Sequence, residues 1–118
     1  MEKVKNLWHC PREFLVCNPQ EMIEVILETM PIIMNIWDDR CRLISTSREA
    51  LEIFGMSSQE EYIARFAEVS PPYQADGANS RDKALACVRQ CLQQDEPMEF
   101  EWMHRTLDDQ PLPARISL

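Results

Sequence analysis

The chain has 118 residues, of which 45% are hydrophobic and 27% charged, as expected of one globular domain with its own core. Its formal net charge is −8, which repels phosphate groups and argues against nucleic acid or an anionic membrane surface as a partner. No apolar run approaches the roughly 20 residues that cross a bilayer, and residues 1–10 lack the apolar stretch of a secretory signal. We therefore expect a cytoplasmic protein.

The cysteines agree with that location. Their number is odd and their spacing shows no paired framework, so the sequence predicts reduced thiols. Two of them, Cys87 and Cys91, are four residues apart on a predicted helix and can share a face, as part of a metal site or as a pair that oxidises. A metal site needs more ligands, and His9 and His104 are both distant in sequence, so we predict no metal site. The five cysteines are Cys10, Cys17, Cys41, Cys87 and Cys91.

The chain is predicted to begin with an extension over residues 1–18, in which residues 14–17 form a short apolar run that can make a strand. A helix follows over residues 19–30, with Asn18 as its N-cap and Pro19 in its first turn, and Pro31 ends it. A helix of this length is marginal alone, so its apolar face must be covered, by its own sheet or otherwise. That face consists of Met22, Ile23, Ile26, Leu27 and Met30.

A hairpin comes next. Residues 31–37 are β-branched and aromatic and predict a strand, residues 38–40 form an acidic turn, and residues 41–46 return as a second strand. Ser47 then caps a helix over residues 48–54, which Gly55 ends in the left-handed conformation.

The remaining elements are two helices and a second hairpin. Ser57 or Ser58 caps the first of these helices, whose apolar face uses Tyr62, Ile63, Phe66 and Val69. Residues 70–79 form a loop, and Ser80 caps a helix over residues 81–94. Strands over residues 98–105 and 111–118 flank a turn. Two hairpins separated by helices predict an α+β fold: one small antiparallel sheet with short helices on one face.

The segments MPIIMNIWDDRCRLISTSREALEIFG, SSQEEYIARFAEVSPPYQADG and FEWMHRTLDDQPLPARISL resemble the first hairpin, the short helices and the second hairpin of a PAS domain. PAS domains are sensor modules of bacterial histidine kinases and related signalling proteins. The resemblance covers about residues 22–118 and implies a sensor domain over residues 19–118. It implies a non-catalytic module that senses a small molecule or a partner and acts on an effector, such as a histidine kinase, in the same or another chain. It also implies a homodimer through the helix over residues 19–30.

The sequence departs from the family pattern in three places. Ser47 stands where the family often has Asn, and Asp109 replaces the glycine usual in the last hairpin turn. The family's sheet has five strands, the last lying between the first and the fourth, and the sequence supplies the first four. The first and fourth strands can pair directly, another chain can contribute a strand, or residues 14–17 can fill the gap. We expect one of the last two solutions.

No catalytic motif competes with this interpretation. Gly55 and Gly77 are the only glycines and cannot make a phosphate-binding loop of the usual kinds. The acidic pairs at residues 38–39 and 108–109 lie in predicted turns, where aspartate serves the backbone. We therefore predict no catalytic residues. The main alternative is a protein-interaction module that dimerises without a ligand, and a weaker one is a small α+β enzyme with a polar cluster in its main cavity.

Seven side chains are candidates for a ligand pocket. Phe100, Trp102 and His104 alternate along one strand and should share a face. His104 either touches a ligand or haem, or ends its strand with its polar tip in water, and we favour the second. The haem histidine of some relatives lies on the long helix, which has none here, and the Asn-Cys-Arg motif of flavin-binding relatives is absent, so neither cofactor is expected. The candidates are Met34, Trp37, Phe54, Val88, Phe100, Trp102 and His104.

Overall fold

A computed structural model describes residues 18–118, and the predicted α+β class is confirmed. The helices are α3 (Pro19–Thr29), α4 (Arg48–Phe54), α5 (Gln59–Ala64), the 3₁₀ helix η1 (Phe66–Val69) and α6 (Ser80–Gln94). The strands are β1 (Asn35–Trp37), β2 (Leu43–Thr46), β3 (Glu99–Arg105) and β4 (Pro111–Ser117). The expected strand over residues 14–17 lies outside the described residues.

Helix caps appear largely where local chemistry predicts them. The Asn18 side chain accepts a hydrogen bond from the Glu21 N–H at 2.9 Å, and Met30 turns to extended backbone before Pro31. Gly55 ends α4 with φ 70°, which a residue without Cβ adopts readily. For α5 the cap is Ser58, whose side chain accepts from the Glu61 N–H.

Two helix predictions need correction. The apolar face predicted from Tyr62 to Val69 is divided, because Arg65 leaves helical geometry (φ −106°, ψ 14°) and the chain continues as η1. The cap of α6 is Asn79, which accepts from the Asp82 N–H, and not Ser80. Ser80 is buried and accepts a hydrogen bond from the Gln74 amide instead.

The first strand is shorter than the predicted residues 31–37. The Ser47 hydroxyl donates to the Ile32 carbonyl at 2.8 Å and accepts from the Met34 N–H at 3.0 Å, so these backbone groups bond to a side chain instead of a strand. A register shift between Ile36 and Trp37 limits the pairing further. The predicted acidic turn is present, and Asp38 Oδ1 accepts from the backbone N–H groups at residues 40 and 42.

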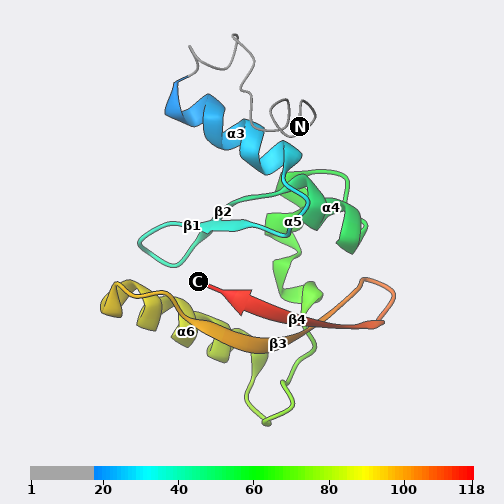
Figure 1. Ribbon diagram of the computed structural model, residues 1–118. Helices are drawn as coiled ribbons and strands as arrows, with labels where there is room; N and C mark the ends of the chain where they lie inside the picture. Colours follow the sequence, from blue (N-terminus) through cyan, green and yellow to red (C-terminus); the bar gives the residue numbers. More distant parts are fainter. Residues whose placement is uncertain (1–17) are drawn as a thin grey trace, which may run out of the picture.

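The hydrophobic core lies between α4, α5 and η1. Its fully buried side chains come from all three helices, and Figure 1 shows α5 running from the β1–β2 ribbon toward β4. The core therefore connects the β1–β2 ribbon with the β3–β4 ribbon. Its buried members are Ala50, Phe54, Met56, Tyr62 and Val69, and Ile33, Leu43, Leu51, Phe66 and Leu112 pack against them.

The expected single sheet is not formed within residues 18–118. There β1 pairs with β2 and β3 pairs with β4, both antiparallel, as two separate two-stranded sheets. In Figure 1, β4 lies on the side of β3 that faces the β1–β2 ribbon. The first and fourth strands therefore do not pair directly within these residues, which removes one of the three solutions named above.

The two edges of the β3–β4 ribbon differ. At the β3 edge, the Met103 N–H donates to Gln74 Oε1 at 2.9 Å, and Gln74 Nε2 donates to the Met103 carbonyl at 3.1 Å. Just beyond the ends of the two strands, residues 98 and 118 exchange both backbone hydrogen bonds. Because such hydrogen-bonded pairs alternate along an antiparallel ladder, the backbone N–H and C=O groups of residues 111, 113, 115 and 117 point away from β3. Because Pro111 and Pro113 carry no N–H, this second edge keeps donors only at Arg115 and Ser117.

Candidate functional site

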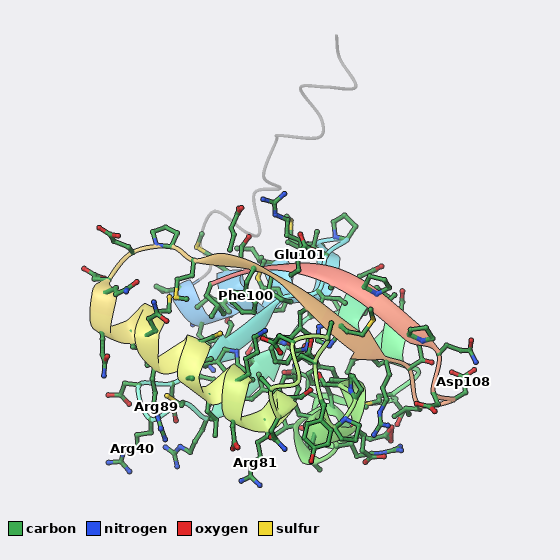
Figure 2. All side chains as sticks on the ribbon, turned by 90° about the horizontal axis from the view of Figure 1, so that it is seen from below. Arg40, Arg81, Arg89, Phe100, Glu101 and Asp108 are labelled. Carbon is green, nitrogen blue, oxygen red and sulfur yellow. The ribbon has the colours of Figure 1, made fainter. Side chains whose placement is uncertain are left out.

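A cavity of about 870 Å³ lies between the two ribbons and α6. Its walls come from β1, η1, α6 and the inner faces of β3 and β4, with parts of α4, α5 and the loop after η1. Figure 2 shows Phe100 on the side of β3 that faces α6 and Glu101 on the opposite side. The β3 alternation therefore turns the aromatic residues toward α6 and the acidic ones outward.

The structure brings five of the seven pocket candidates together. Trp37, Val88, Phe100, Trp102 and His104 all line the cavity, although they come from three elements far apart in sequence.

The other two candidates, Met34 and Phe54, do not line it. Met34 precedes β1, where its N–H bonds to the Ser47 hydroxyl and its carbonyl to the Ser47 N–H. Phe54 is 2% exposed in the core, because α4 turns it toward Tyr62 and away from the open space. The apolar pattern of the sequence does not tell whether a side chain lines the cavity or packs elsewhere.

A continuous set of aromatic contacts joins the cavity wall to the core. Neighbouring ring centroids lie between 5.3 and 6.5 Å apart, the range of favourable edge-to-face and tilted packing. The rings between the β3 end of this series and its β1 end are therefore in continuous contact through the core. In order, the rings are Phe100, Trp102, His104, Phe54, Tyr62, Phe66 and Trp37.

His104 is buried, and the prediction of a polar tip in water is wrong. It is 6% exposed, and its Nδ1 lies 3.1 Å from the Val69 carbonyl oxygen. A carbonyl oxygen only accepts hydrogen bonds, so Nδ1 carries the proton and Nε2 is left as an acceptor in the neutral ring. Burial lowers the pKa of His104 below its usual 6.5, against the opposing effect of the Val69 hydrogen bond. The ring is therefore neutral at pH 7.

Ser70 holds this part of the wall in place, and the sequence did not single it out. The Trp102 indole N–H donates to Ser70 Oγ at 3.0 Å, and the same oxygen lies 3.5 Å from His104 Nδ1. A buried tryptophan needs a partner for its N–H, so the sequence implied that some acceptor exists. Which residue supplies the acceptor, 32 positions away, could be known only from the folded structure.

The ionisable side chains that line the cavity are Glu49, Arg81, His104, Arg105 and Arg115. Within residues 18–118 no three of the His, Cys, Asp and Glu side chains are grouped so as to hold a metal ion. Desolvation raises the pKa of the Cys87 thiol, with a nearby lysine opposing it, which keeps the thiol protonated. In Figure 2, Arg81 and Arg89 project from α6 away from β3.

The candidate dimer helix, α3, exposes most of its apolar face. Four of its side chains, Met22, Ile23, Ile26 and Met30, are between 42% and 51% exposed. Leu27 is the exception at 5% exposed, because α3 packs beside α4, where Arg48 also forms an ion pair with Glu28 at 2.7 Å. The helix therefore rests on α4 and not on a sheet, and Leu27 has to be removed from the candidate interface.

Among the helices of residues 18–118, none combines the length and the apolar character that a bilayer-crossing segment needs. Comparison of the chain with known proteins found no match to any protein-family model, to any curated protein or to any solved structure.

Proposed function

We propose that this chain is a non-catalytic, PAS-like sensor module of a bacterial signalling protein. The observation that carries the proposal is the cavity of about 870 Å³ bounded by both ribbons and α6, with a largely apolar wall. Its volume lies in the range of about 300–1,000 Å³ that is typical of small-molecule sites. The order of hairpin, short helices, long helix and hairpin is the second support.

A ligand changes a protein only through unequal affinity for two packings of it. The aromatic contacts from Phe100 to Trp37 supply packed neighbours through which an occupied cavity alters the core and the β1–β2 ribbon. The effector, in the proposal a histidine kinase, lies in the same or another chain. We also propose a cytoplasmic location, which the free thiols of Cys41, Cys87 and Cys91 support.

A PAS-like sheet requires one more strand, between β1 and β4. Two observations support this part of the proposal: neither strand has a second partner in the described part of the chain, and the β4 edge retains N–H donors at Arg115 and Ser117. Unpaired edges of this kind accept an added strand. The proposal is that another chain or residues 14–17 supply it.

The proposed dimer forms through α3. An apolar face of four side chains on a helix that buries only Leu27 needs a cover, and a second copy of α3 provides a matching apolar face. The variant Ile26→Glu places a charge in that face, and Glu24→Gln on the same helix is its control. Sedimentation velocity should show a dimer for the parent chain and the control, and a monomer for Ile26→Glu.

A thermal-shift screen of small molecules on the full chain tests the sensor function itself. A ligand that binds the folded state raises Tm in a concentration-dependent way. The alternative, an interaction module without a ligand, is favoured by the exposed face of α3. It predicts no shift with any compound, together with self-association that Ile26→Glu abolishes.

A further inference from the structure

We propose that His104 Nε2 is the hydrogen-bond acceptor of the cavity and selects uncharged, flat aromatic molecules that carry an O–H or N–H donor. This inference rests on the proposed function, because it names the ligand class of the same cavity. It concerns one buried side chain whose orientation the fold determines.

The first step is the orientation of the ring. His104 Nδ1 is occupied by the Val69 carbonyl, with Ser70 Oγ beside it, which assigns the lone pair to Nε2. Edge-on packing against Phe54, at 5.4 Å between centroids, holds the plane of the ring. The imidazole therefore presents an acceptor in a fixed direction.

The second step is that Nε2 faces open space. Among the described residues, the Tyr62 hydroxyl is the one wholly buried side-chain nitrogen or oxygen without a hydrogen-bond partner. Nε2 makes no hydrogen bond with these residues either, so it is not wholly buried. His104 is 6% exposed and lines the cavity, so we assign the open side of Nε2 to the cavity.

The third step is the chemistry of the surrounding wall. Trp102 and Phe100 extend from His104 along β3, and Leu85 and Val88 of α6 line the same space. Flat apolar rings pack well against such walls in offset or edge-on geometry. The wall therefore favours an aromatic skeleton over a flexible or highly polar one.

The fourth step is the placement of the arginines that line the cavity within residues 18–118. Arg105 and Arg115 both reach the cavity lining, but Arg105 bonds to the Glu68 carbonyl and pairs with Asp109, and Arg115 pairs with Glu99. Arg81 also lines the cavity, but its side chain projects away from β3, the strand that carries His104, in Figure 2. The arginines of the lining are therefore either paired or directed away from His104, which favours a neutral donor as the partner of Nε2.

The test compares two probes of nearly equal shape, 2-naphthol and 2-methoxynaphthalene, of which only the first has a donor. Calorimetric titration of the full chain at pH 7.5 should give a Kd about three- to tenfold lower for 2-naphthol, the effect of one neutral hydrogen bond. Equal affinities for the two probes would overturn the assignment of His104.

Two variants separate the acceptor from the fold. His104→Asn keeps an amide N–H at the position of Nδ1, where it can still donate to Val69, but removes the acceptor. It should bind both probes equally. His104→Gln extends its amide to the position of Nε2 and should keep the preference for 2-naphthol.

A measurement on the unmodified protein covers the case in which a variant does not fold. In a long-range ¹H–¹⁵N spectrum, 2-naphthol should shift the Nε2 resonance of His104 and 2-methoxynaphthalene should not. If neither probe binds, the aromatic ligand class is wrong, whereas the sensor proposal still stands or falls on the separate thermal-shift screen.

Discussion

The short helices α4, α5 and η1 are packed very differently from the long helix α6. On one side, α4, α5 and η1 are short helices that contribute Ala50, Tyr62 and Val69, all with no exposed surface. On the other, α6 is the longest described helix, with 15 residues, yet it buries only Ser80 and Val88. The short-helix side therefore stabilises the fold by close packing, whereas the α6 side leaves the cavity open.

The largest expected effect contrasts Phe54 with Phe100. Truncating a fully buried phenylalanine costs about 3–5 kcal/mol, so Phe54→Ala should lower the free energy of unfolding by that order. Phe100 is half-buried at the cavity, where no tight packing is lost, so Phe100→Ala should cost less than half as much. Urea denaturation measures both, and equal losses would break the distinction between core and cavity wall.

The variant Gln74→Ala tests whether hydrogen bonds of polar side chains, and not close apolar packing, stabilise the α6 side. Its buried amide bonds to Ser80 and to both backbone groups of Met103, so Gln74→Ala should cost about 1–3 kcal/mol through the groups left without partners. It also uncovers the β3 edge, which favours aggregation. Urea denaturation and light scattering give the two readouts. Gln110→Ala, at an exposed turn residue, is the control and should change neither.

Ser47 is the corresponding polar group on the short-helix side. Its hydroxyl caps α4 and bonds to backbone groups at residues 32 and 34, so Ser47→Ala should cost about 1–2 kcal/mol. The exposed Ser57 provides a matched control, Ser57→Ala, for which no measurable change is expected. A neutral result for Ser47 in urea denaturation would mean that packing alone holds β1 against α4.

The smallest expected effect is the pH dependence from His104. Its folded-state pKa lies below 6.5, so the unfolded chain binds the proton first as pH falls. The contribution is complete above about pH 6.5 and is lost as pH falls toward the folded-state value, with a slope of at most about 1.4 kcal/mol per pH unit for one proton. The difference between the parent chain and His104→Gln, followed by urea denaturation from pH 8 to 5, isolates it from the carboxylates. A constant difference over that range would contradict the burial of a neutral ring.

Local sequence was sufficient for the starts of α3, α4 and α5 and for the turn of the first hairpin. Asn18 and Ser58 cap helices because each side-chain oxygen reaches an N–H three residues on, and Gly55 adopts a left-handed conformation without a Cβ clash. These interactions act within one turn of chain. Strand length was predicted less well, since Ser47 withdraws the backbone near Met34 from pairing, across 13 positions.

The candidate site was predictable only in part. Alternation correctly grouped Phe100, Trp102 and His104 on one face, because side chains of a strand alternate whatever lies around them. The same alternation does not tell which face is buried, and the expectation that His104 ends its strand with its polar tip in water was wrong. Ser70 and Gln74 left no recognisable signal, since their partners on β3 are 29 to 34 positions away.

By itself, then, the sequence determined the α+β class, the order of the elements and most of their caps, because periodicity and short-range hydrogen bonds are local. Only the tertiary structure decided that the two ribbons stay separate within residues 18–118, that Phe54 belongs to the core, and that α3 exposes its apolar face. These outcomes depend on which surfaces meet after the chain has folded back on itself. Which surfaces meet depends on packing between residues that are far apart in the sequence, and no local pattern encodes such contacts.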